Sequence, residues 1–384
     1  MVRRHAPLSA FLWPAVVAWL LAVQCAAVAQ PLPPPVIAAQ AYVLLDVASG
    51  QVIAAENADE RREPASLTKL MTAYLAFAAL RDKSVTPSQQ VTVSTAAWHA
   101  EGSRMFIEPK KAVTVDELLR GMIVQSGNDA SIALAELLAG SEAAFAEKMN
   151  AEAARLGLAN THFENATGLS QPKHYSTAMD LARLSAALVR DFPDDYKLYS
   201  LREYRYNNIS QANRNRLLWI DPSVDGMKTG FTEAAGYCLV ASAKRGERRL
   251  ISVVMGAQSD VLRMTESQKL LNFGFQAYET RMLYKKNVAV GTPEIFKGTK
   301  ATLSVGFKDD VWLSLPRDKF SGLQSTLETK QPFVAPFAAG EKAGIMKLTR
   351  DNAKVADLPV VALEDVPVAG FLSRGWDTLR LLLR

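Results

Sequence analysis

Ser66 and Lys69 are the residues of this sequence whose types and spacing best fit joint chemistry. They open residues 66–80, where apolar residues recur at helical spacing just after Pro64, so this run is predicted to be a buried helix. Residues three apart on a helix share a face, which would place the Ser66 hydroxyl beside the Lys69 amine. Burial disfavours the charged form of a lysine, and a neutral amine is able to take the serine proton. The pair therefore predicts a serine nucleophile with a lysine base.

The same spacing occurs a second time, at Ser170 and Lys173, so the motif alone is weak. Pro172 lies between these two residues, in a stretch that also contains Gly168. A proline there disfavours a helix, so the second pair lacks the setting that would align its side chains.

A polar loop, Ser126-Gly127-Asn128, separates two helical patterns. The first pattern opens with a capping box at Thr114, and the second is expected to resume at Ala130. A loop held by a helix on each side would be fixed in position. Taken alone, the loop is better explained as a simple helix–helix turn.

Lys228, Thr229 and Gly230 lie in a predicted strand that is followed by strand patterns at 236–243 and 249–255. Short turns join these runs, which predicts adjacent antiparallel strands. A glycine at the edge of such a sheet lets another backbone approach closely. The motif is therefore expected at a strand edge that faces a partner.

The surrounding patterns predict one sheet with a helical insertion. Residues 41–55 read as a hairpin, residues 114–190 as mostly helical and residues 261–279 as a long helix, so early and late strands must pair across the insertion. Short strand-like runs then predict a small β-sandwich. The expected segments are a signal peptide at 1–29, a catalytic domain at 30–285, a β-sandwich domain at 286–366 and a terminal amphipathic helix at 367–384.

The N-terminus has the three parts of a secretory signal. Arg3 and Arg4 precede an apolar run at 10–23, and the small residues 27–29 fit a cleavage site. Export is the prediction. A membrane-spanning anchor is the first alternative, although the apolar run is short, and a lipid anchor at Cys25 is the second.

Composition excludes several classes of protein. The 384 residues are 49% hydrophobic and 22% charged, as in ordinary globular proteins, and loss of the leader's two arginines lowers the net charge from +5 to +3. Basic residues are scattered, which argues against nucleic-acid binding. Cys238 is the only cysteine after cleavage and is predicted to pack in a strand. No metal-ligand spacing occurs, so neither a metal nor a cofactor is expected.

The last residues predict an amphipathic helix. One side would carry the apolar residues Val368, Phe371, Leu372, Trp376, Leu379, Leu382 and Leu383. The charged residues Arg374, Asp377, Arg380 and Arg384 would lie elsewhere. Such a helix is too short and too charged to cross a membrane, and it is predicted to lie in the membrane interface. The alternative is a helix packed on the β-sandwich.

The three motifs follow one another in the order Ser66-x-x-Lys69, Ser126-Gly127-Asn128 and Lys228-Thr229-Gly230. This set resembles that of penicillin-binding proteins and serine β-lactamases. Runs at 213–219, 225–232 and 235–237 are similar to the low-molecular-weight penicillin-binding proteins that are serine-type D-alanyl-D-alanine carboxypeptidases, the peptidase S11 family. The resemblance covers about residues 37–384. It implies an α+β fold, in which a β-lactamase-like transpeptidase domain with an antiparallel sheet and a helical subdomain precedes a small all-β domain and a terminal amphipathic helix.

The resemblance implies an activity: removal of the terminal D-alanine from peptidoglycan stem pentapeptides, at the periplasmic face of the inner membrane, with β-lactams as covalent inhibitors. Ser66 would attack the carbonyl with Lys69 as general base, giving an acyl-enzyme that water hydrolyses. Ser126 would relay a proton to the leaving amine, and Asn128 would hold the substrate amide. Backbone N–H groups of Ser66 and of the Lys228 strand would form the oxyanion hole.

The resemblance also implies how the substrate's terminal carboxylate is bound. Lys228 and Thr229 would meet it, with Gly230 beside them on the same strand. Arg263, which falls where the family places an arginine on the following helix, would assist. The alternative for Arg263 is an ordinary surface residue, and the functional role is the prediction.

The sequence departs from some members of the family at Thr167 and Phe231, where a histidine can occur. These two positions could tune deacylation and β-lactam turnover. His162 is expected to be structural, because the mechanism requires no histidine.

Three alternatives stay open. A D,D-endopeptidase or a β-lactamase would use the same acyl chemistry, although residues 164–168 lack the Glu-x-x-Leu-Asn motif of a class A β-lactamase. The third is a β-lactam- or peptidoglycan-binding protein whose serine is acylated without turnover.

Overall fold

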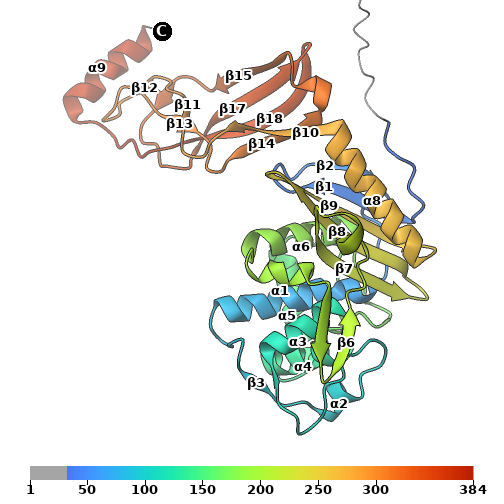
Figure 1. Cartoon of the computed structure of the whole chain (residues 1–384). Helices are drawn as coiled ribbons and strands as arrows, with labels where there is room; N and C mark the ends of the chain where they lie inside the picture. Colours follow the sequence, from blue (N-terminus) through green and yellow to red (C-terminus); the bar gives the residue numbers. More distant parts are fainter. Residues whose placement is uncertain (1–32, 384) are drawn as a thin grey trace, which may run out of the picture. The chain divides into compact units, whose positions relative to one another are not determined.

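The computed structural model describes residues 33–383 of the chain, so the predicted signal peptide and Arg384 lie outside the described residues. The central sheet has five antiparallel strands in the order β2-β1-β9-β8-β7 (Figure 1). Their bounds are Ala41–Asp46 for β1, Val52–Glu56 for β2, Val224–Thr232 for β7, Gly236–Arg245 for β8 and Arg248–Ala257 for β9. The predicted hairpin and late strands are thus present, and β7 forms one edge.

Helices cover both faces of this sheet. One hydrophobic core joins β1, β8 and β9 to the helices of the insertion, and a second joins the opposite face to α8 (Asp260–Ala277). The insertion helices are α1 (Lys69–Arg81), α3 (Val115–Val124), α4 (Asn128–Ala139), α5 (Glu142–Arg155) and α6 (Ala178–Asp191). Because both faces are covered, residues 238–243 of β8 are all buried, including Cys238.

Shorter elements connect these parts. They are β3 (Gln90–Val91), α2 (Thr95–Trp98), β4 (Val113–Thr114), the 3₁₀ helix η2 (Asp195–Ser200), β5 (Glu203–Tyr206), β6 (Ile209–Ala212) and α7 (Leu217–Ile220). The predicted capping box at Thr114 and Glu117 is formed at the start of α3. The helix after the polar loop begins at Asn128, two residues earlier than expected.

The all-β part begins immediately after α8. Strand β10 (Tyr278–Tyr284) lies before the expected boundary at 286 and pairs with β14 (Val311–Pro316). A five-stranded sheet has the order β11-β13-β18-β17-β15, and β12 pairs with β16. Their bounds are Ala289–Gly291 (β11), Ile295–Phe296 (β12), Val305–Gly306 (β13), Leu323–Thr329 (β15), Phe333–Val334 (β16), Lys342–Arg350 (β17) and Ala353–Ala362 (β18), with the 3₁₀ helix η3 at Arg317–Lys319. The predicted α+β fold class with a C-terminal β domain is confirmed.

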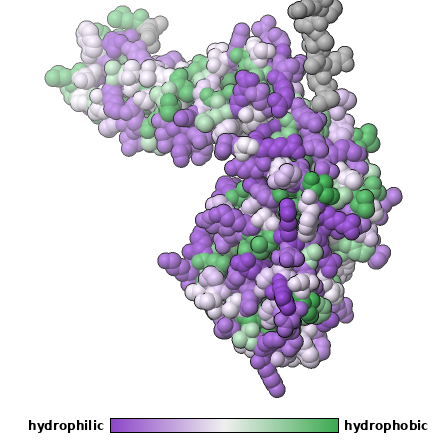
Figure 2. All heavy atoms as spheres, viewed as in Figure 1, coloured by the Kyte–Doolittle hydropathy of each residue, from purple (hydrophilic) through white to green (hydrophobic). Residues whose placement is uncertain are grey.

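The terminal helix α9 spans Phe371–Leu382. Its polar side contacts the β domain: the Asp377 carboxylate accepts a hydrogen bond from the backbone N–H of Lys297, and the Arg380 guanidinium pairs with Glu294. Six apolar side chains of this segment are between 51% and 87% exposed, namely Phe371, Leu372, Trp376, Leu379, Leu382 and Leu383. Figure 2 shows hydrophobic residues gathered around this helix. Val368, predicted on the helical face, instead precedes the helix and bridges Gly298.

Within residues 33–383, no helix is both long and apolar enough to span a membrane.

Candidate active site

Ser66 lies in a turn of 3₁₀ helix, η1 (Ala65–Thr68), which leads directly into α1. The turn is held tightly: Ala65 adopts a positive φ of 48°, and its carbonyl oxygen would be only 1.8 Å from a Cβ added to Gly168. A non-glycine residue with positive φ is sterically unfavourable and is often found at functional sites. The predicted helix is therefore present, but its first turn is 3₁₀ and presents Ser66 at a constrained corner.

Lys69 is buried beneath this corner, with 1% of its surface exposed. Its Nζ lies 2.9 Å from Ser66 Oγ, 2.7 Å from Asn128 Oδ1 and 2.6 Å from the carbonyl oxygen of Thr167. Burial, and secondarily the charge of Arg214, lower the pKa of Lys69 from 10.5 to about 7. A neutral amine has two N–H donors and one lone pair. The two donors match the amide and carbonyl oxygens, which leaves the lone pair facing Ser66.

The polar loop places Ser126 and Asn128 opposite Ser66. Ser126 is buried and has a φ of 70°, and Asn128 begins α4 with its Nδ2 donating to the carbonyl of Glu101 at 2.6 Å. The buried Asp129 carboxylate accepts hydrogen bonds from backbone N–H groups of residues 105–107. These bonds tie the loop to a second segment, so it is more than a simple turn.

Lys228 reaches Ser126 from strand β7. Its Nζ donates to Ser126 Oγ at 2.9 Å and to the carbonyl oxygen of Thr229 at 3.0 Å. The side chain is 3% exposed, and burial, followed by the positive charges of Lys69 and Arg214, lowers the pKa of Lys228 well below its usual value. A negatively charged ligand beside it would restore its charge.

Gly230 lies where β7 meets the Ser66 turn. A Cβ at this position would come within 3.2 Å of Ser66 N and 3.1 Å of the carbonyl oxygen of Pro64, so the close approach favours glycine. Arg263 of α8 donates from Nη1 to the carbonyl oxygen of Gly230 at 3.0 Å. Arg263 is thus a cleft residue and no ordinary surface arginine.

These residues surround one cleft of about 450 Å³. Ser66, Ser126, Asn128, Thr229, Gly230 and Arg263 line it, while Lys69 and Lys228 lie beneath its floor. All eight residues predicted for the site are therefore brought together, from segments up to about 200 residues apart. Among the described residues, no group of histidine, cysteine and carboxylate side chains could hold a metal ion.

The family comparisons match both parts of the chain. Residues 26–259 match the D-alanyl-D-alanine carboxypeptidase family (peptidase S11), and residues 278–368 match the penicillin-binding protein 5 C-terminal domain. The chain belongs to the D-alanyl-D-alanine carboxypeptidase family. The resemblance seen in the motifs is confirmed, and with it assignment to a family of serine hydrolases.

Two named relatives match most of this chain, and a third matches about two thirds of it. D-alanyl-D-alanine carboxypeptidase DacC of Escherichia coli is 40% identical, over 98% of this chain and 95% of the relative. Penicillin-binding protein 5 of Haemophilus influenzae superposes with a TM-score of 0.85 at 40% identity, covering 87% of this chain and 99% of that one. Penicillin-binding protein D2 of Listeria monocytogenes, in its ampicillin-bound form, has a TM-score of 0.59 at 31% identity, covering 64% of this chain and all of that one.

Three groups in or beside the site were not predicted from the sequence. The Thr167 carbonyl is a backbone atom, which no residue type reveals. Arg214 lines the cleft and donates to the carbonyl oxygen of Gln125, and its signal was the run 213–219 that resembled the family. His174 is buried behind η1, where its Nε2 lies 2.7 Å from Thr68 Oγ1 and its Nδ1 accepts the N–H of Glu164.

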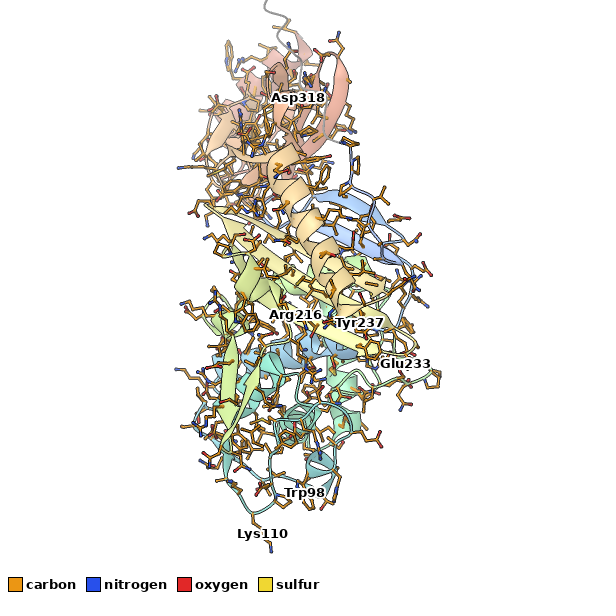
Figure 3. The ribbon with its side chains drawn as sticks, turned by 45° about the vertical axis from the view of Figure 1, so that its right-hand side comes forward. Trp98, Lys110, Arg216, Glu233, Tyr237 and Asp318 are labelled. Atoms are coloured by element: carbon orange, nitrogen blue, oxygen red, sulfur yellow. The ribbon has the colours of Figure 1, made fainter. Side chains whose placement is uncertain are left out.

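The two departures from the family have different surroundings. The Thr167 side chain is buried, and its hydroxyl donates a hydrogen bond to the Asn165 side chain. Phe231 is 44% exposed, lines the cleft and packs against Tyr237 with ring centroids 4.4 Å apart. Figure 3 labels Tyr237 beside the N-terminal end of α8, which also carries Arg263. His162 hydrogen-bonds the carbonyl of Lys173, and it is not among the residues that line the cleft.

Proposed function

We propose that this protein is a serine-type D-alanyl-D-alanine carboxypeptidase that removes the terminal D-alanine from peptidoglycan stem pentapeptides. The observation that carries the proposal is the set of partners around Lys69 Nζ, two acceptor oxygens plus the Ser66 hydroxyl. This set suits a neutral amine that accepts the serine proton. It couples the nucleophile to its base before any substrate arrives.

In acylation, Ser66 Oγ bonds to the carbonyl carbon between the two terminal D-alanines while its proton moves to Lys69. The backbone N–H of Ser66, next to Gly230 on the β7 side, supports an oxyanion hole for the carbonyl oxygen. The C–N bond then breaks. Ser126 gives its proton to the departing amine nitrogen and takes one from Lys228, 2.9 Å away. Water attacks the acyl-enzyme next, and its proton passes through Ser126 back to Lys228. As the acyl bond breaks, Lys69 returns its proton to Ser66 Oγ, which releases the shortened peptide and restores the Ser66 hydroxyl.

The terminal carboxylate of the substrate would be held at the opposite side of the cleft from Asn128. Thr229 offers a hydroxyl there, and Arg263 and Lys228 offer positive charge. A carboxylate beside Lys228 stabilises the ammonium form and raises its pKa, so Lys228 becomes able to supply the proton that Ser126 relays. The remaining N–H of Asn128 Nδ2 is available to the substrate amide.

β-Lactams are proposed to acylate Ser66 in the same cleft. The relative from Listeria monocytogenes was solved with ampicillin bound, and its chain superposes over its full length. Turnover of the acyl-enzyme formed from a peptide, and not of the β-lactam adduct, separates a carboxypeptidase or an endopeptidase from a protein that binds without release.

The deciding experiment measures free D-alanine released by the full chain from a pentapeptide that ends in D-Ala-D-Ala, with Ser66→Ala beside it. Release that is lost in the variant supports the proposal and its nucleophile. Penicillin labelling of Ser66 without release would favour a non-turnover binding protein, and cleavage of cross-linked peptides would favour an endopeptidase. Release that survives Ser66→Ala would contradict the mechanism.

We further propose that the protein is exported to the periplasm by its leader and held at the inner-membrane surface by α9. The support is the exposed apolar side of α9, whose polar side already contacts the β domain. Leu372→Glu together with Leu379→Glu should release the active full chain from membranes, whereas Ser373→Glu on the polar side should not. Retention of the double variant would contradict the anchor, and a mature N-terminus other than Gln30 would contradict the cleavage site.

A further inference from the structure

Two aromatic rings form part of the wall of the catalytic cleft. Phe231 of β7 and Tyr237 of β8 both line the cleft, lie directly opposite each other in the antiparallel register, and have ring centroids 4.4 Å apart. Phe231 is 44% exposed, so its ring is open to a ligand. None of the catalytic steps proposed above uses either ring. Most other residues that line the cleft are polar or glycine, so this aromatic pair is an apolar surface inside a polar site.

The aromatic pair lies beside the groups that would hold the terminal carboxylate of the substrate. Side chains two residues apart on a strand share a face and are about 7 Å apart, so Phe231 follows Thr229 along one face of β7. Residues directly opposite each other in an antiparallel pair share a face as well, which places Tyr237 there. Helix α8 covers this face, and the Arg263 guanidinium lies 5.4 Å from the centroid of the Tyr237 ring. The carboxylate-binding groups and the aromatic pair therefore meet at one end of the cleft.

The leaving residue of the substrate would face this end. In the proposed reaction its amine nitrogen lies at Ser126 and its carboxylate at Thr229, and the carbon atom between them bears its side chain. That side chain cannot enter the floor of the cleft, because the buried Lys69 and Lys228 lie beneath it. It is left to lie along the wall, where Phe231 follows Thr229. A methyl group is too short to cover the exposed ring, whereas a side chain of leucine size would reach it.

We propose that Phe231, supported by Tyr237, binds the side chain of the leaving residue and selects apolar D-amino acids, including ones larger than D-alanine. This inference rests on the proposed carboxypeptidase function. It adds a substrate class, namely stem peptides whose terminal residue carries a larger apolar side chain. The physical reason is burial: an apolar side chain and the exposed ring leave water together, whereas a polar side chain loses hydrogen bonds to water against the same ring.

The test uses the full chain and three pentapeptides that are identical up to the fourth residue and end in D-alanine, D-leucine or D-asparagine. Leucine and asparagine side chains have the same branched shape, so these two peptides differ in polarity with little change in size. Release of the terminal amino acid gives kcat/KM for each peptide. The D-leucine peptide should exceed the D-alanine peptide by about 2–10-fold, as expected when roughly one further methylene group is buried. The D-asparagine peptide should lack this advantage.

Variants at Phe231 assign the preference to the ring. Phe231→Gln and Phe231→Ala should lower kcat/KM for the D-leucine peptide to about that of the D-alanine peptide, and Phe231→Leu should keep part of the advantage because it retains an apolar surface. Val261→Ala is the matched control, since Val261 is an exposed apolar residue of α8 that does not line the cleft. It should change none of the ratios between peptides. A substitution that only loosens the fold would lower all three values together and leave the ratios as they are.

Two outcomes would overturn the inference. One is a parent enzyme that cleaves the D-leucine peptide less efficiently than the D-alanine peptide, and the other is an advantage that survives both Phe231→Gln and Phe231→Ala. If none of the three peptides is cleaved, the proposed function fails, and the aromatic pair is then tested by how strongly each peptide slows Ser66 acylation by benzylpenicillin. Stronger protection by the D-leucine peptide, lost in Phe231→Gln, would support the binding site by itself. Equal protection by the D-leucine and D-asparagine peptides would overturn it.

Discussion

The catalytic cleft contains two serine–lysine pairs that have the same distance between hydroxyl and amine but are built from different parts of the chain. In both, Nζ lies 2.9 Å from the serine hydroxyl, but Ser66 and Lys69 are three residues apart whereas Ser126 and Lys228 are 102 residues apart. Burial lowers the pKa of both lysines. The first pair is a product of one helical turn, and the second exists only because β7 packs against the polar loop.

The other hydrogen-bond partners of the two lysines explain why the pairs have different roles. The protein surrounds Lys69 Nζ with three oxygen atoms, so this lysine is complete without substrate. Lys228 Nζ has two protein acceptors, Ser126 and the Thr229 carbonyl, whereas the ammonium form that a substrate carboxylate restores has a third donor. The unused donor suits a substrate carboxylate. We infer that the first pair is preset for proton abstraction and that the second is completed by the substrate.

Lys69→Ala should produce the largest difference between the pairs. Loss of the general base is expected to lower both D-alanine release and penicillin acylation by about 10²–10⁴-fold. The second-order rate of Ser66 acylation measures this effect. Lys173→Ala, at the other Ser-x-x-Lys sequence, should leave it unchanged, and a Lys69→Ala variant within tenfold of the parent would break the assignment of the first pair.

Lys228→Gln should weaken recognition of the substrate's terminal carboxylate. A hydrogen bond to a charged group contributes about 1.5–3 kcal/mol, so kcat/KM for a pentapeptide with a free terminal carboxylate should fall about 10–100-fold. For the same peptide with a terminal carboxamide, kcat/KM should fall much less. The variant should therefore lose the parent enzyme's preference for the free carboxylate over the carboxamide. Lys197→Gln, at an exposed lysine paired with Asp194, is the matched control. An equal loss on both peptides would contradict the role of the second pair.

The pH dependence of Ser66 acylation should follow the protonation of the Lys69 amine. Since only the neutral amine accepts the serine proton, the rate should fall as pH decreases below the pKa of Lys69, about 7. The charge of Arg214 contributes to lowering that pKa, so Arg214→Gln should move the acid limb to higher pH. The profile of penicillin acylation between pH 5 and 9 measures both. A limb that moves to lower pH would contradict this electrostatic account.

A separate prediction concerns the stability of the fold behind the first pair. Burial lowers the pKa of His174 from 6.5 to about 4, opposed by the Glu164 and Glu63 carboxylates. Between these values the unfolded chain binds the proton and the folded chain does not, so the free energy of unfolding should fall as pH decreases from 6.5 to 4, by on the order of 3 kcal/mol.

Urea unfolding across this range tests the prediction. The His174→Gln variant should lack this part of the pH dependence, because it has no group that titrates there. His162→Gln, in the same part of the chain but outside the cleft lining, should retain it. The same slope in both variants would show that His174 does not carry the effect.

Several features of the fold could be predicted because their causes are local. The capping box at Thr114, the hairpin at 41–55 and the helix after Ser66 depend on residues within a few positions of one another. The bounds of α4 and the full burial of β8 could not be predicted from the sequence, since they depend on the segments that pack against these elements. Asn128 begins a helix early because its loop is tied to distant segments.

The residue types and the order of motifs determined the family, the fold class and the near pair of Ser66 and Lys69, because helical periodicity fixes neighbours three residues apart. Only the tertiary structure decided the rest of the cleft. The Thr167 carbonyl that completes Lys69 is an atom every residue has, and the contact between Ser126 and Lys228 needs a folded sheet edge. Hydrogen bonds between distant segments form only after packing has brought their backbones together.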